Sequence, residues 1–294
     1  MSLLKEVELS ANEREFIPEA IRQGVRLDGR RLDQYRELDL SFGEEYGNVT
    51  ATLGHTVVLV RISSEITKPR QGREFEGIYN ISLELTNMAS PAIENGRQTE
   101  LEFHTQRMLD RIARTSNYVE TESLCLVAGS KVWTIRADIH VLSFDGGLLD
   151  CCSIALMAAL RHFRLPEVTV RGGKVTVYDL GEKAPVPLNL TTQPLSCTFR
   201  VFENGKIILL DPTLKEEQAS QGMAVVAMDS GGVLCLYSKI GGIPVPALKL
   251  IDCQQVARAR VKEHTDIITK VLAKDEAKRT SRYAGLVATA ANER

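Results

Sequence analysis

Residues 131–164 read KVWTIRADIHVLSFDGGLLDCCSIALMAALRHFR. From Lys131 to Leu142 polar and apolar side chains alternate, and this period of two is typical of a strand with one buried face. Asp145-Gly146-Gly147 predicts a turn, and the apolar run from Leu149 to Arg164 predicts a helix that Pro166 would end. A half-buried strand followed by an apolar helix predicts one α/β unit.

The residues before this stretch complete the first unit. We expect a β-hairpin from Val49 to Ile62, a polar loop over 67–76, a strand over 78–85 and a helix over 99–115. An opening helix is predicted over 8–23, where Ser10 and Glu13 have the spacing of a capping box.

A second unit is predicted after the apolar helix. Glycine turns separate three pairs of short strands, and two helices accompany them. We expect hairpins over 168–178, 196–210 and 223–238, a short helix over 213–220 and a long amphipathic helix over 247–275. The predicted class is α+β, with mixed or antiparallel sheets, an N-terminal helix and arm over 1–35, and two α/β units over 36–165 and 166–294.

Composition excludes several functional classes. The chain has 294 residues, of which 44% are hydrophobic, and a formal net charge of −2, so neither a disordered chain nor a strongly basic nucleic-acid binder is expected. It has no apolar run of the roughly 20 residues that a membrane helix needs, and its start does not resemble a signal peptide. The six cysteines form no CxxC pair, and the five histidines are scattered, so we predict reduced thiols, no metal and no cofactor.

The first candidate site is a row of arginines, Arg107, Arg111 and Arg114. Their spacing of four and three residues places them on one helix face, beside the apolar stripe that includes Met108 and Ile112. Guanidinium groups suit phosphate contacts. The alternative is a solvated face, paired with nearby acids. Lys68, Arg70 and Arg73 form a weaker basic cluster on the predicted loop.

The second candidate site is the glycine turn before the apolar helix. Free N–H groups at a helix start can bind an anion. Here Leu148, Leu149 and Asp150 follow the turn, and they offer no hydroxyl or arginine to an anion. Because the carboxylate of Asp150 would repel phosphate and cap the helix itself, we favour a structural turn.

The third candidate site is the acidic stretch from Asp211 to Glu217. An acid at a strand end, followed by others along a helical turn, can bind magnesium or act as an acid–base group. The simpler interpretation, which we favour, is that Asp211 or Thr213 caps the short helix and that Glu216 and Glu217 complement its dipole.

These three segments, in this order, resemble the RNase PH family of phosphorolytic 3′→5′ exoribonucleases, from about Glu8 to Leu272. Arg26-Leu27-Asp28-Gly29-Arg30 is similar to the family's N-terminal signature. Residues 106–114 are similar to its arginine-bearing helix, which in the family contacts the RNA backbone. Asp145-Gly146-Gly147 matches the loop before the family's phosphate site. The resemblance thus implies an RNase PH-like fold.

The departures from the family pattern imply an inactive chain. Active members follow the glycine turn with Thr or Ser and then Arg, which hold phosphate, whereas this chain has Leu148 and Leu149. Active members carry an Asp-x-Asp pair and a further Asp, whereas the matching positions here are Asp211, Thr213 and Glu217. Phosphorolysis needs a bound phosphate and a group that offsets charge on the leaving oxygen. The resemblance therefore predicts no enzymatic activity.

Non-catalytic RNase PH-like subunits of the exosome ring have a similar replacement, Gly147-Leu148-Leu149-Asp150 in this chain. Residues 121–125 and 10–20 are most similar to one eukaryotic subunit of that branch. The resemblance implies a structural subunit, paired as a heterodimer with another RNase PH-like chain in a six-membered ring, together with cap subunits and an associated nuclease. Single-stranded RNA would pass through the channel for processing, including that of rRNA, and degradation, in the nucleus, nucleolus and cytoplasm.

On this hypothesis Arg107, Arg111 and Arg114, with Lys68, Arg70 and Arg73, contact RNA phosphates without reading sequence. One alternative is an active phosphorolytic exoribonuclease that uses Asp211 and Glu217. The other is a protein scaffold without RNA contact. Near-neutral charge fits a ring component, since most of its surface would meet other proteins.

Overall fold

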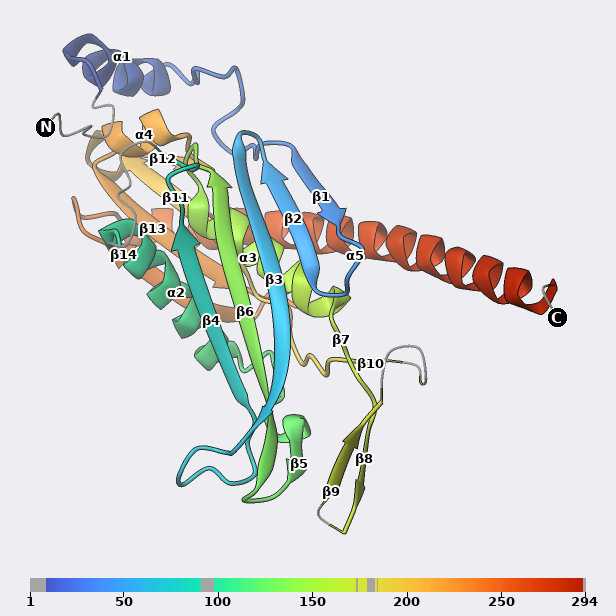
Figure 1. Ribbon diagram of the computed structural model, residues 1–294. Helices are drawn as coiled ribbons and strands as arrows, with labels where there is room; N and C mark the ends of the chain where they lie inside the picture. The colour runs from blue at the N-terminus through green and yellow to red at the C-terminus, as the bar shows by residue number, and fades with distance from the viewer. Residues whose placement is uncertain (1–8, 91–97, 173, 179–182, 184, 293–294) are drawn as a thin grey trace, which may run out of the picture.

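The computed structural model describes residues 9–90, 98–172, 174–178, 183 and 185–292, and two sheets dominate it (Figure 1). The first sheet has the strand order β1-β2-β3-β6-β4, and β5 pairs with the start of β6. Its pairs are antiparallel except β4 with β6, which is parallel, so the sheet is mixed as predicted. The strands are β1 (Leu38–Phe42), β2 (Asn48–Leu53), β3 (Thr56–Thr67), β4 (Ile78–Leu85), β5 (Cys125–Val127) and β6 (Lys131–Ser143).

The second sheet is wholly antiparallel, in the order β12-β11-β13-β14. It contains β11 (Leu195–Phe202), β12 (Ile207–Leu210), β13 (Gly222–Met228) and β14 (Leu234–Ile240). Two small ribbons connect the sheets: β7 (Arg164–Leu165) with β10 (Val186–Pro187), and β8 (Val168–Arg171) with β9 (Lys174–Val177). The hairpins predicted in this half of the chain are therefore confirmed.

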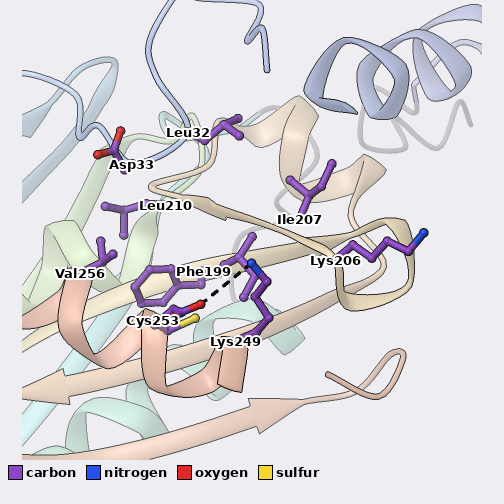
Figure 2. A pocket seen from close by; sticks show the side chains of 11 residues that line it. Leu32, Asp33, Phe199, Lys206, Ile207, Leu210, Lys249, Cys253 and Val256 are labelled. Atoms are coloured by element: carbon purple, nitrogen blue, oxygen red, sulfur yellow. Dashed lines mark ion pairs between the residues drawn. The ribbon is translucent and has the colours of Figure 1, made fainter. Parts of the chain in front are cut away.

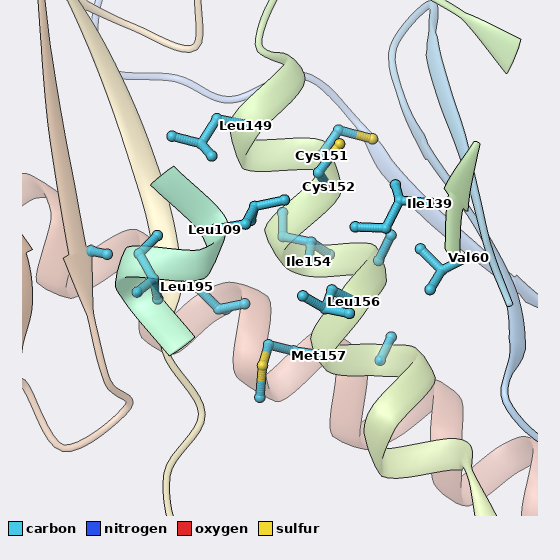
Figure 3. Close-up of a cluster of buried hydrophobic side chains, with 14 of the residues drawn as sticks. Val60, Leu109, Ile139, Leu149, Cys151, Cys152, Ile154, Leu156, Met157 and Leu195 are labelled. Carbon is cyan, nitrogen blue, oxygen red and sulfur yellow. The ribbon is translucent and has the colours of Figure 1, made fainter. Parts of the chain in front are cut away.

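The helices are α1 (Ala11–Arg22), α2 (Glu100–Ser116), α3 (Leu148–His162), α4 (Leu214–Ala219) and α5 (Ala247–Asn292). α3 packs on β2 and β3 of the first sheet and on β11 of the second, so it lies between the sheets. Every residue of α3 except Arg161 is buried. Figure 3 shows Ile154 and Leu156 of α3 near Val60 and Ile139 of the first sheet. α3 thus forms the centre of one core that both sheets share.

Three element ends differ from the sequence predictions. α3 ends at His162, before Pro166, because Arg164 and Leu165 pair with β10 instead of continuing the helix. β3 continues to Thr67 through the start of the predicted loop, paired with β6 throughout. α5 extends to Asn292 rather than to residue 275, and its end projects from the body (Figure 1).

The N-terminal arm spans both sheets. The capping box predicted at Ser10 and Glu13 is present, and α1 buries Ile17 and Ile21 against Phe202 and Leu209 of the second sheet. The chain then runs to β1 of the first sheet (Figure 1). The arm thereby brings its arginines between the two units. Among the described helices, none is both long and apolar enough to cross a bilayer.

Candidate functional site

Asp211 is the centre of a buried ion cluster. It lies directly after β12, has φ of +47°, and its side chain is completely buried. Arg36 donates from Nη2 to Asp211 Oδ1 at 2.7 Å and from Nε to Oδ2 at 3.0 Å, and Arg30 Nη1 donates to Oδ2 at 2.9 Å. Both carboxylate oxygens are therefore bound to arginines, Arg30 of the arm and Arg36 directly after it.

The same Arg36 side chain holds the glycine turn. It donates to the carbonyl oxygens of Asp145 at 2.8 Å and Gly146 at 3.0 Å. Gly146 and Gly147 have φ of +77° and +63°, in the left-handed region. A Cβ on Gly146 would lie 2.6 Å from the backbone of Pro212, and one on Gly147 would meet Arg36. The turn needs glycine for close approach as well as for its backbone angles.

We expect Gly147→Ala to lower the free energy of unfolding by at least about 3 kcal/mol, since left-handed strain adds to displacement of a buried ion pair. Gly24 is the matched control, because it has φ of +78° and open space around its Cα. Gly24→Ala should lose only about 1–2 kcal/mol in urea unfolding. Equal losses for the two variants would show that the contact with Arg36 contributes nothing.

The N–H group at the start of α3 is already bonded to a carboxylate of the chain. Gly147 is the N-cap residue of α3, and its N–H donates to Glu217 Oε1 at 3.2 Å. Arg200 lies 3.1 Å from the same oxygen. One N–H group at this turn is therefore already bonded to a carboxylate, and the charge of that carboxylate would oppose an anion at the start of α3.

The short helix α4, which contains Glu217, also supplies Glu216 to this cluster. Thr213 is its N-cap and forms a capping box with Glu216, which confirms a capping role for Thr213 rather than for Asp211. Glu216 also binds Arg26, with Nη2 to Oε2 at 2.6 Å, and both side chains are buried. Arg26 of the arm and Arg36 directly after it thus form two buried ion pairs, with Glu216 and with Asp211.

The two leucines after the turn face the core. Leu148 is 4% exposed and Leu149 is 7% exposed, so neither side chain is available to a polar ligand. Asp150 does not cap α3, contrary to the prediction. Its carboxylate is buried and accepts hydrogen bonds from Tyr35 Oη, Ser196 Oγ and the backbone and side chain of Thr198. Burial raises the pKa of Asp150 to about 7, although the hydrogen bonds from Thr198 oppose the shift.

The acids here are neutralised by protein cations. Asp211, Glu216 and Glu217 each bind at least one arginine. Within the described part of the chain, no group of three or more His, Cys, Asp or Glu side chains could hold a metal ion. The cluster is therefore built to join the arm, the turn and α4 rather than to hold a ligand.

The three helix arginines lie together on the surface. Arg107, Arg111 and Arg114 are exposed, and none forms an ion pair with a described residue. Glu102, one of the nearby acids, is 5% exposed and belongs to the capping box of α2 with Thr99. The structure thus gives a row of exposed guanidinium groups along one side of α2, although the charge of Arg114 acts on Asp110 and opposes the rise that burial causes in its pKa.

The loop cations lie apart from that row. Arg70 Nη2 donates to Asn80 Oδ1 at 3.1 Å, on the exposed face of β4, whereas α2 packs on the opposite face, where Gln106 bonds Ile81 O. Arg73 forms an exposed ion pair with Glu76, and Lys68 is exposed. The structure does not bring the two basic groups together on one surface.

A cavity of about 320 Å³ lies between β12 and the start of α5 (Figure 2). Its lining is mostly apolar and includes Phe199, Ile207, Leu210 and Val256. An ion pair between Lys249 and Asp252, 3.9 Å apart, lies at this site. The side chains that line it include neither the arginine row nor Asp211.

Comparison with known proteins places the chain in a family. Models of the RNase PH 3′ exoribonuclease family match residues 34–166 as domain 1 and residues 192–260 as domain 2. The exosome complex component rrp45 of Schizosaccharomyces pombe is 40% identical over 290 residues, which cover 99% of each chain. The chain belongs to the RNase PH family. The fold and the family that the sequence predicted are both confirmed.

Other proteins similar to this RNase PH chain are also exosome components. The human exosome complex component RRP45 is 42% identical over 273 residues, which cover 93% of this chain and 62% of the human protein. These matches agree with the predicted similarity to one eukaryotic exosome subunit, the polymyositis/scleroderma autoantigen-type component. A solved structure, the Archaeoglobus fulgidus exosome with RNA bound to the active site, aligns with a TM-score of 0.76 over 87% of this chain and 97% of that one. At 24% identity, that likeness concerns the fold alone.

Two residues of the RNase PH ion cluster are missed by the sequence analysis. Arg36 stands alone between Tyr35 and Glu37, and Arg200 lies within a strand, so neither forms a motif. A signal does exist for Arg26 and Arg30, because they are the first and last residues of the Arg-Leu-Asp-Gly-Arg signature. In this structure Arg26 makes buried contacts to Leu210 and Glu216, and Arg30 makes a partly buried contact to Asp211.

Proposed function

We propose that this chain is a catalytically inactive, structural and RNA-contacting subunit of an exosome core ring. The observation that carries the proposal is the exposed row Arg107, Arg111 and Arg114, in a protein that has two buried leucines at the corresponding phosphate site. The relatives named as exosome complex components support the assembly. The ring would guide RNA through its channel toward 3′→5′ processing and degradation by a separate nuclease.

The absence of activity follows from the contacts of the turn. Inorganic phosphate would need the N–H of Gly147 and polar side chains at positions 148 and 149. Glu217 occupies that N–H, and both leucines are buried in the core. We therefore assign Leu148, Leu149, Asp150, Asp211, Thr213 and Glu217 as degenerate positions of the ancestral active site.

The RNA contact follows from the chemistry of the exposed row. Arginines on one helix face can bind successive phosphates of a single strand without reading its sequence. Lys68, Arg70 and Arg73 would contact the strand at a second place, because the loop lies on the other side of β4.

The assembly would use most of the remaining surface. We propose a heterodimer with another RNase PH-like chain, a six-membered ring, cap subunits and an associated nuclease, located in nucleus, nucleolus and cytoplasm. The same proposal divides the chain into an arm over 1–35 and units over 36–165 and 166–294. It requires neither cofactor nor metal.

Phosphorolysis assays test the inactivity. The purified chain, alone or in its ring, should release no nucleoside diphosphates from RNA in the presence of phosphate. Phosphate-dependent release that Asp211→Asn abolishes would instead establish an active exoribonuclease. An RNase PH chain with intact phosphate and acid motifs serves as the positive control.

Crosslinking separates the RNA-contacting role from that of a pure scaffold. Photoreactive RNA bound to the assembled ring should form adducts within residues 100–116 of this chain, as mapped by mass spectrometry. Adducts confined to other subunits would support the scaffold.

A further inference from the structure

Phe103 is an exposed aromatic side chain in line with the arginine row. It lies on α2 and is 57% exposed. At about 100° per residue, Arg107, Arg111 and Arg114 fall within about 80° of Phe103 around the helix axis. Phe103 therefore opens the stripe on which all three guanidinium groups lie.

The rest of α2 shows that this stripe is distinct from the buried one. Thr105, Met108, Leu109 and Ile112 pack inward, on the side of the helix away from Phe103. The described chain offers the Phe103 ring no aromatic or cation–π partner. Neither face of the Phe103 ring is thus covered by a described aromatic ring or cation, and the ring lies next to the arginine row.

The ring and the guanidinium groups follow one another along the helix axis. A rise of about 1.5 Å per residue puts Phe103 about 6 Å before Arg107 along the helix, and Arg114 about 10 Å beyond Arg107. Groups that hold single strands without sequence preference combine such cations with aromatic rings on which bases stack. An exposed aromatic ring alone could bind either nucleic acid or protein. Because the Phe103 ring lies in line with exposed guanidinium groups, RNA is the favoured ligand.

We propose that Phe103 is a base-stacking platform for the single-stranded RNA whose phosphates the row from Arg107 to Arg114 holds. This inference rests on the proposed function and names a ligand contact that the arginines do not supply. Stacking accepts any base, so the site would increase affinity without sequence preference.

The test compares Phe103→Ala and Phe103→Trp in the reconstituted ring. The probes are an unstructured RNA and the same RNA with abasic positions, each titrated at several salt concentrations. Phe103→Ala should weaken binding of the intact RNA by at least about fivefold. The slope of affinity against salt should not change, because stacking releases no counterions. Phe103→Trp should retain binding, and abasic RNA should bind wild type and Phe103→Ala alike.

The contrary outcomes are distinct. Wild-type affinity in Phe103→Ala would overturn the stacking site, as would an equal loss with abasic RNA. Loss of subunit assembly in Phe103→Ala would show instead that the Phe103 side chain docks on a neighbouring protein. Unchanged RNA binding after charge reversal at Arg107 and Arg111 would reject the proposed function itself. If that reversal weakens RNA binding but Phe103→Ala does not, the stacking platform alone is rejected.

Discussion

Replacing Asp211 with alanine is expected to lower the free energy of unfolding by about 3–5 kcal/mol. The substitution leaves the Arg36 guanidinium, only 7% exposed, without the carboxylate that binds it. Arg30 loses the same partner. Because Arg36 also holds the carbonyl groups of the glycine turn, we expect the arm and the start of α3 to loosen together.

Urea unfolding of the purified chain measures this effect. Glu45→Ala is the control, since Glu45 and Arg61 form an ion pair in which both side chains are more than 60% exposed. The free energy of unfolding of Glu45→Ala should fall by less than about 1 kcal/mol. Adding Arg36→Met to Asp211→Ala should restore part of the stability, because it removes the stranded charge. A loss at Asp211 no larger than that at Glu45 would refute a structural role for the cluster.

Local sequence patterns predict the elements of this fold well. The period of two over 131–142 and the apolar run after the glycine turn correspond to β6 and α3, which the structure places at the shared core. Spacing predicts the capping box at Ser10, whereas the sequence leaves Asp211 and Thr213 as alternative caps of α4. Such features depend on neighbours within a few residues, so a single sequence contains them.

Contacts between distant residues could not be predicted in this way. Asp211 and Arg36 are 175 positions apart, and each has an ordinary local explanation as a cap or a surface charge. Asp150 illustrates the same limit, because its place in the first turn of α3 suggests a cap, whereas its partners come from β11 and the arm. The pairing that ends α3 at His162 likewise depends on Val186 and Pro187.

The arginine row lies between these cases. Helical spacing placed Arg107, Arg111 and Arg114 on one face, but it left open whether the nearby acids neutralise them. The structure shows Glu102 directed into a capping box, and none of the three guanidinium groups forms an ion pair with a described residue, although the charge of Arg114 acts on Asp110.

Reversal of two of these charges should strongly weaken RNA binding by the ring. Arg107→Glu with Arg111→Glu removes two phosphate contacts and adds two repulsive charges, so we expect at least a roughly tenfold loss of affinity at low salt. Both side chains are exposed, so the stability of the chain should change little. Arg31→Glu is the control, because Arg31 is 83% exposed and lies on the arm.

The salt dependence of that binding is the most direct test of the RNA-contacting role. The logarithm of the affinity of the reconstituted ring for single-stranded RNA is measured against the logarithm of salt concentration, with and without Arg107→Glu and Arg111→Glu. We predict that the double variant has a slope shallower by about 1.4, because each phosphate contact with a single strand contributes about 0.7. An affinity and a slope equal to those of the wild-type ring would contradict the assignment.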